Sequence, residues 1–226
     1  MLYSFTTPGM ASIHYRSFGM AAVAIAGLPT VWNIVARNEY HRHTIEKTLG
    51  GKKAGAYFLA AAIFVASGVR DYLFYNAMAN TPGTELPILP THAFGAGNVG
   101  VVRSVMSGIG TALMLTGTTL VVSSFLRLGV TGTYLGDYFG ILMEERVTTF
   151  PFSHFENPMY LGATLNFLAT SIAQNNAVGA VLTGWVALVY HISTKYFENP
   201  FTAMIYSRRD EENRAASRAS GAVKKH

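Results

Sequence analysis

The chain has no cysteine among its 226 residues. This absence excludes disulfide bonds, thiolate zinc sites and a cysteine nucleophile. Charged residues are also scarce, at 13%, whereas hydrophobic residues make up 50%. A soluble globule of this composition would lack a polar surface, so the composition indicates a membrane protein. We find no internal repeat and no coiled-coil heptad, and we expect no secretory signal peptide at the amino end.

The net charge of +5 raises the question of nucleic-acid binding. However, the basic residues gather beside apolar runs, over residues 37–53 and in the tail after residue 206. Basic segments of this kind stay in the cytosol and suit anionic lipid headgroups. We therefore expect a membrane partner and no nucleic acid. We also expect one membrane-embedded domain over residues 1–206 and a charged cytosolic tail over residues 207–226.

Four apolar segments predict membrane-spanning helices. Residues 105–125 carry no charge over a length that crosses the hydrocarbon core. Three consecutive amides, Gln174-Asn175-Asn176, would be costly inside lipid, so they predict a turn between two helical arms. The sequence thus predicts an all-α integral membrane bundle with spanning helices over residues 54–79, 105–125, 159–173 and 177–192.

Two apolar runs contain residues that disturb a simple span. Gly27 and Pro29 interrupt the first run, residues 18–36, so a kinked or re-entrant helix fits it as well as a straight span. Arg70 and Asp71 interrupt the next run, and we expect them to pair or snorkel near a membrane interface. The predicted bundle therefore has four spanning helices and a kinked or re-entrant amino-terminal helix.

A polar, aromatic and glycine-rich connection over residues 129–162 separates the apolar runs, and the positive-inside rule puts it on the cytosolic side. Its motifs LGDYFGIL, RVTTFPF and NPMYLG, with VWNIVAR before them and FENPFTAMIY after them, resemble the phospholipid N-methyltransferases. The resemblance spans roughly residues 30–206. It implies an enzyme that uses S-adenosylmethionine, and no metal, to methylate phosphatidyl-N-methylethanolamine and its dimethyl successor to phosphatidylcholine. Phosphatidylethanolamine is a further substrate to consider, and the endoplasmic reticulum or mitochondrial membrane is the implied location.

The resemblance also implies residues that hold S-adenosylmethionine. The family's Gly-x-Gly element falls in register on Leu115, Thr116 and Gly117, and only Gly117 matches it. Packing of small residues between membrane helices is the other explanation of this glycine. The family's pair of adjacent acidic residues falls on Glu198 and Asn199, so an amide replaces the second carboxylate.

An Asn-Pro-x-Tyr-x-Gly block matches the family at Asn157, Pro158, Tyr160 and Gly162. Asn157 suits the cap of a helix and Pro158 its first turn, so neither residue needs a role in a site. Capping does not explain the other two residues. We therefore expect Tyr160 and Gly162 to line the cofactor site.

The implied reaction needs a general base, because an ammonium group must lose a proton before it is methylated. The candidates for this base are Asp137, His154 and Glu144, followed by Glu145 and His191. The aromatic residues of the connection either face a quaternary ammonium product or form an interfacial belt. Arg127 and Arg146 either hold the lipid phosphate or simply follow the positive-inside rule.

Two other functions are open to a chain of this kind. The first is a non-catalytic membrane protein that binds lipid or transports a small molecule. It would need polar residues lining a path through several spans, whereas these spans are mostly apolar with Gly, Ser and Thr. The second is a related carboxyl methyltransferase, whose substrate needs no base. It would leave the matches LGDYFGIL and ENPFTAMIY unexplained.

Overall fold

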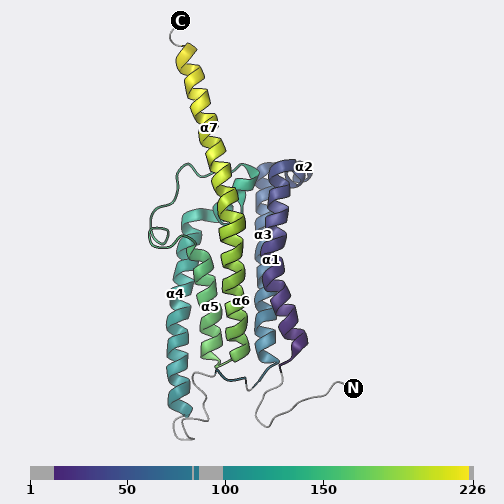
Figure 1. The fold of residues 1–226 in the computed structure, drawn as a ribbon, viewed down its shortest axis with the longest axis vertical. Coiled ribbons are helices and arrows are strands. Elements are labelled where there is room, and N and C mark those ends of the chain that lie inside the picture. The colour runs from purple at the N-terminus through teal and green to yellow at the C-terminus, as the bar shows by residue number, and fades with distance from the viewer. Residues whose placement is uncertain (1–12, 83, 87–98, 224–226) are drawn as a thin grey trace.

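The computed structural model describes residues 13–82, 84–86 and 99–223, which form helices and connections and no β-strand. The elements are α1 (Tyr15–Arg42), α2 (Thr44–Leu49), α3 (Lys52–Ala79), α4 (Val99–Thr133), the 3₁₀ turn η3 (Gly136–Phe139), α5 (Pro158–Ala173), α6 (Ala177–Ile192), η4 (Ser193–Glu198) and α7 (Asn199–Val223). Helices α1, α3, α4, α5 and α6 lie side by side, and α7 extends α6 beyond the bundle (Figure 1). The predicted all-α bundle is confirmed.

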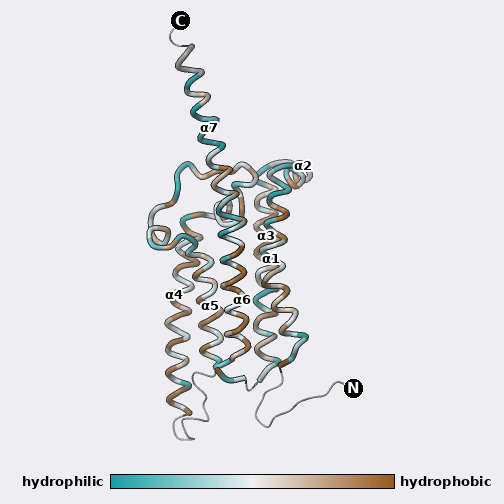
Figure 2. The backbone as a smooth tube through the Cα atoms, viewed as in Figure 1, coloured by the Kyte–Doolittle hydropathy of each residue, from teal (hydrophilic) through white to brown (hydrophobic). Residues whose placement is uncertain are grey.

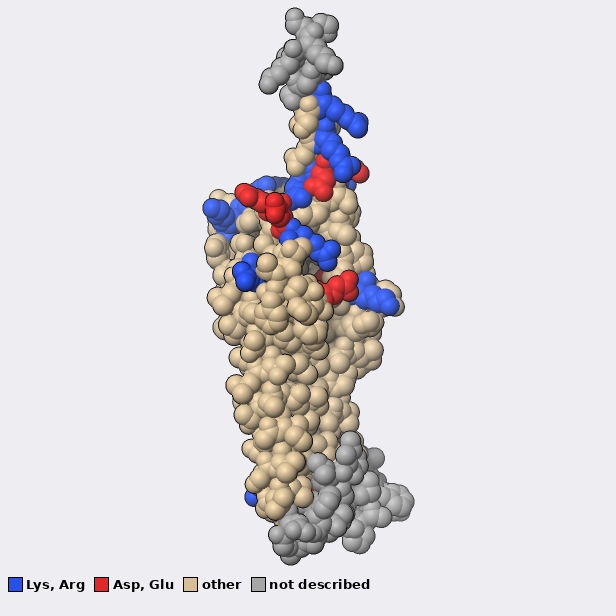
Figure 3. All heavy atoms as spheres, turned by 90° about the vertical axis from the view of Figure 1, so that its left-hand side faces the viewer, with Lys and Arg blue, Asp and Glu red and all other residues tan. Residues whose placement is uncertain are grey.

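Four helical segments are long and apolar enough to cross a membrane, namely α1, α3, α4 and the continuous run from α6 into α7. Apolar residues follow the length of the bundle, and polar residues gather toward one end and along α7 (Figure 2). Lys, Arg, Asp and Glu concentrate at that same end, which we call the charged end (Figure 3). This distribution is the one expected of a multi-pass membrane protein.

Helix α1 is continuous from Tyr15 to Arg42, although Pro29 lies inside it. Pro29 has no backbone N–H and therefore leaves the Ile25 carbonyl without its usual helical donor. The side-chain amide of Asn33 donates to a different carbonyl, that of Pro29, at 2.9 Å. Helix α1 is therefore continuous and not broken at Pro29, and it is long and apolar enough to cross a membrane.

The turn from α1 to α2 is organised by Glu39, whose side chain is fully buried. Its carboxylate accepts the backbone N–H groups of Ile45 at 2.6 Å and Glu46 at 3.0 Å, which caps α2. His43 lies nearby with a left-handed φ of 53° and bonds to Glu46. The side chains of Glu39, His43 and Glu46 lie close enough together to hold a metal ion. The Glu39 carboxylate, however, already accepts two backbone N–H groups.

Helices α4 and α5 approach closely because glycines face each other across their contact. A Cβ atom on Gly117 would lie 2.6 Å from the Gly162 carbonyl oxygen, and one on Gly110 would lie 2.9 Å from the Ala169 carbonyl oxygen. Only residues without a side chain let two backbones come this near. The packing explanation of Gly117 is therefore confirmed.

Arg70 and Asp71 pair as expected, with Nη2 and Oδ1 2.8 Å apart. Of the two predicted alternatives, pairing and snorkelling, the structure shows the pairing, with the Arg70 side chain buried. Its side chain points into the bundle, donates to the Tyr190 hydroxyl and lies over the ring of Phe167, 5.3 Å from the ring centre. Polar and aromatic partners inside the bundle replace the water that a snorkelling arginine would seek.

The turn between α5 and α6 forms at Gln174, Asn175 and Asn176, as the sequence predicted. The Asn176 side chain caps α6 by accepting the backbone N–H of Gly179 at 2.9 Å. The two arms therefore run antiparallel, and both outer ends point toward the charged end (Figure 1).

Candidate active site

The carboxylate of Glu198 accepts hydrogen bonds from three separate parts of the chain. From α1, Trp32 Nε1 and Asn33 Nδ2 donate to Oε1 at 3.2 and 3.1 Å. Ser193 Oγ donates to the same oxygen at 2.7 Å, and the Tyr160 hydroxyl of α5 donates to Oε2 at 2.6 Å. This many donors hold a carboxylate in one orientation and compensate its partial removal from water.

The backbone of η4 explains how Ser193 reaches Glu198. Residues five apart lie on different faces of an α-helix, but η4 is π-helical, and its wider turn brings such residues together on one face. Short π-helical segments inside longer helices occur frequently at functional sites. Here the segment joins α6 to α7 and sets the direction of the Glu198 side chain.

Three buried polar atoms near Glu198 have no hydrogen-bond partner within the described part of the chain: Asn33 Oδ1, Arg37 Nε and Tyr138 OH. Asn33 bonds to Glu198 itself, and Arg37 donates to the carbonyl of Phe197 at 2.8 Å. Leaving such a group unpaired costs about 1–3 kcal/mol. An acceptor, a donor and a hydroxyl left open beside a carboxylate are the features of a site for a polar ligand.

Asp137 lies in η3, beyond the break at Gly129 that ends the regular part of α4. Its Oδ2 accepts a hydrogen bond from Thr202 Oγ1 at 3.0 Å. Burial raises the pKa of the Asp137 carboxyl above its ordinary value, and the negative charge of Glu198 raises it further, while the bond from Thr202 opposes both. The two carboxylates therefore belong to one electrostatic environment.

The other base candidates lie elsewhere on the connection. His154 is exposed, bonds to Ser153 Oγ at 2.7 Å and lies against the ring of Phe155. Glu144 is also exposed, and Arg209 of α7 donates to its backbone carbonyl at 3.4 Å. Neither side chain hydrogen-bonds to Glu198 or its partners in the described structure. Among these three candidates, Asp137 is the one whose pKa the Glu198 charge raises.

Within the described structure, no hydrogen bond links the predicted cofactor residues of α4 to Glu198. Leu115 and Thr116 are exposed on α4, and the Thr116 hydroxyl bonds to its own helix at Ala112 O. Gly117 lies in the contact with α5, and Asn199 is exposed at the start of α7. Of the residues predicted to hold the cofactor with Glu198, only Tyr160 bonds to its side chain.

Sequence reasoning missed the contribution of α1. The motif VWNIVAR carries part of the resemblance, but none of its residues was predicted to belong to the site. Asn33 and Arg37 are four residues apart and therefore share one face of the helix. Two polar side chains on one face of an apolar helix are the signal that points to a buried polar site.

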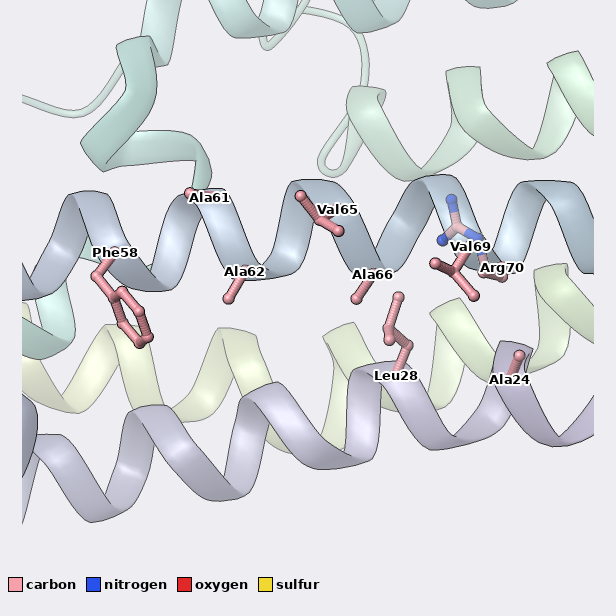
Figure 4. A pocket seen from close by; sticks show the side chains of 9 residues that line it. All are labelled: Ala24, Leu28, Phe58, Ala61, Ala62, Val65, Ala66, Val69 and Arg70. Carbon is pink, nitrogen blue, oxygen red and sulfur yellow. The ribbon is translucent and has the colours of Figure 1, made fainter.

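A groove between α1 and α3 is separate from these residues (Figure 4). Its lining is apolar except for Arg70 at one end, so it lacks the carboxylates and hydrogen-bond donors that surround Glu198. The lining residues are Ala24, Leu28, Phe58, Ala61, Ala62, Val65, Ala66, Val69 and Arg70.

Comparison with known proteins shows the family. The family described as Phospholipid methyltransferase matches residues 105–209. Phosphatidyl-N-methylethanolamine N-methyltransferase of Saccharomyces cerevisiae is 43% identical over 86% of this chain and 87% of its own length. Phosphatidylethanolamine N-methyltransferase of Rattus norvegicus is 40% identical over 85% of this chain and 89% of its own length. No solved structure matches. With similarity over most of both chains, this chain belongs to the phospholipid methyltransferase family.

Proposed function

We propose that this protein transfers methyl groups from S-adenosylmethionine to phosphatidyl-N-methylethanolamine and its dimethyl successor, giving phosphatidylcholine. The observation that carries the proposal is the Glu198 carboxylate, held by α1, α5 and η4 beside open polar groups. Relatives named for the monomethylated lipid are 42–43% identical to this chain, and those named for phosphatidylethanolamine are 38–41% identical. We therefore rank phosphatidyl-N-methylethanolamine first among the candidate substrates.

The residues around Glu198 fit S-adenosylmethionine, which supplies a methyl group on a positively charged sulfur. The carboxylate offers negative charge, and Asn33 Oδ1 and the Tyr138 hydroxyl are buried groups without a partner among the described residues. Tyr160 keeps the carboxylate in place from the opposite side. The site residues Leu115, Thr116, Gly117, Gly162 and Asn199 stay predictions. Displacement at a methyl carbon needs proximity and orientation and no metal.

We assign the general base to Asp137. Its raised pKa favours proton uptake, and the influence of the Glu198 charge on it supports a place in the same site. The lipid ammonium loses its proton to this carboxylate, and the freed nitrogen lone pair then forms the bond to carbon as the carbon–sulfur bond breaks. His154 and Glu144 are exposed and lack a link to the Glu198 group, so we rank them lower.

The site lies toward the charged end of the bundle, where η3, η4 and the start of α7 meet α1. By the positive-inside rule this end faces the cytosol, which supplies water-soluble S-adenosylmethionine while the acyl chains stay in the bilayer. We propose that the protein is located in the endoplasmic reticulum membrane, and the mitochondrial membrane is the other candidate. We keep the division into a domain over residues 1–206 and a tail over residues 207–226, although α7 is continuous across it.

The test is an assay of the purified protein in lipid vesicles with methyl-labelled S-adenosylmethionine. Separate vesicles contain the unmethylated, monomethylated or dimethylated ethanolamine lipid. We expect label in phosphatidylcholine from the monomethylated and dimethylated lipids. Absence of label from all three lipids would refute the proposal, and label only in a prenylated cysteine peptide would favour carboxyl methylation instead.

A further inference from the structure

Arg37 is a partly buried cation that forms no ion pair with any residue in the described ranges. One nitrogen, Nη2, donates to the backbone carbonyl of Phe197 at 2.8 Å. The guanidinium also lies over the rings of Phe197 and Phe201, 5.5 and 4.8 Å from their centres. These contacts fix its plane but supply no anion bonded to the guanidinium, because a carbonyl and two rings carry no net charge.

The unpaired edge of Arg37 has the geometry of an anion site. Its Nε is buried and has no acceptor within the described residues. Nε and the nitrogens at the end of the guanidinium form a rigid fork of donors, which matches two oxygens of a phosphate or carboxylate. A fixed guanidinium with a free buried donor loses little entropy when such an anion binds.

Arg37 is one helical turn from Asn33, which contacts the Glu198 carboxylate. At a rise of 1.5 Å per residue, the two side chains start about 6 Å apart along α1. In an ethanolamine lipid, a two-carbon link joins the phosphate to the amine. A phosphate at Arg37 therefore leaves the amine in the neighbourhood of Glu198.

Exposed apolar side chains lie close to Arg37 in the sequence of α1 and at its contact with η4. Ile34, three residues earlier and on the same side of α1, is 63% exposed, and Phe197 and Tyr196 are 44% and 61% exposed. Exposed apolar side chains on spanning helices face lipid. An anion that binds beside these lipid-facing side chains is therefore one that the membrane supplies, such as a lipid phosphate.

We propose that Arg37 binds the phosphate diester of the lipid substrate and so determines that the amine methylated is that of a phospholipid. The inference rests on the proposed function. It replaces Arg127 and Arg146 as candidates for this role, because both are exposed and make no contact with the Glu198 group in the described structure. It also gives α1, which lies outside the family match over residues 105–209, a part in substrate recognition.

The test measures initial rates of the full chain in mixed micelles, varying the mole fraction of phosphatidyl-N-methylethanolamine and the concentration of S-adenosylmethionine separately. For Arg37→Gln we expect the lipid KM to rise about tenfold or more, as for loss of a charge-assisted bond, with the donor KM unchanged. Arg37→Lys keeps the charge but not the fork, so we expect a rise of about threefold. Arg42→Gln, at an exposed position near the end of α1, is the matched control and should leave both KM values unchanged.

Three outcomes separate the hypotheses. If the unaltered protein transfers no label to lipid, the proposed function fails. If it is active and Arg37→Gln leaves the lipid KM unchanged, or raises the donor KM instead, the inference is overturned. Binding of S-adenosylhomocysteine at the original affinity shows that the variant is folded, and if Arg37→Gln does not fold, the lipid KM of Arg37→Lys decides.

Discussion

The charge of Glu198 is the feature whose removal tests the site most sharply, and Glu198→Gln removes it with almost no change of shape. The glutamine oxygen can still accept from Trp32, Asn33 and Ser193, which all donate to one oxygen of the carboxylate. The glutamine nitrogen then faces the Tyr160 hydroxyl, which can rotate and accept. We therefore expect the variant to fold.

The expected loss follows from the charge. A hydrogen bond or contact to a charged group in a partly buried site contributes about 1.5–3 kcal/mol. Each 1.4 kcal/mol is a factor of about ten, so kcat/KM for S-adenosylmethionine should fall about 10- to 100-fold. The neutral sulfur of S-adenosylhomocysteine should be less sensitive, and its affinity should fall less than that of the cationic donor.

The assay combines label transfer to phosphatidyl-N-methylethanolamine with binding of both sulfur compounds to the same detergent-solubilised preparation. Thermal unfolding is followed in parallel as the control for folding. A Glu198→Gln protein with undiminished kcat/KM and undiminished donor affinity would remove Glu198 from the cofactor site.

Three further predictions follow from the packing and the electrostatics. Gly117→Leu should lower the melting temperature and abolish activity, because its Cβ would lie 2.6 Å from the Gly162 carbonyl oxygen. The control Gly108→Leu has no atom within 4 Å of its Cβ and should change neither property, so equal melting temperatures of the two variants would contradict this prediction. Arg70→Gln should destabilise the bundle by about 1–3 kcal/mol, measured by thermal unfolding, because it weakens the bonds to Asp71 and Tyr190; an unchanged unfolding curve would be the contrary result. Asp137→Asn should lower kcat about 100-fold or more and remove the fall in rate at low pH, because a carboxylate base becomes protonated as the pH drops through its raised pKa. A pH–rate profile of unchanged shape would argue against Asp137 as the base.

The sequence was sufficient to predict that the apolar runs are helical, because lipid requires long uncharged runs and satisfied backbone groups. The amide turn at 174–176 and the α-helical character of each apolar run follow from this requirement alone. The course of α1 through Pro29 did not follow, since a proline permits either a break or a continuous helix. The side chain of Asn33, which supplies a bond to the Pro29 carbonyl, had no visible role before the fold was known.

The site was predicted only in part, for a different physical reason. Glu198 and Tyr160 were expected to act together, and a hydrogen bond of 2.6 Å joins them. Their α1 partner, Asn33, is 165 residues from Glu198 in the chain, and no local pattern shows which faces of two distant helices meet. The π-helical turn at η4 is equally hidden, because it depends on how α6 and α7 pack. Arg70 is a further example: its ion pair with the adjacent Asp71 could be predicted from the sequence, but its bond to the distant Tyr190 could not.

The most direct test of the account is an experimental structure of the protein with S-adenosylhomocysteine bound. We expect the ligand to contact the Glu198 carboxylate and Asn33 Oδ1, the buried oxygen without a partner in the described structure. A ligand bound elsewhere, such as in the apolar groove between α1 and α3, with Glu198 and Asn33 untouched, would contradict it.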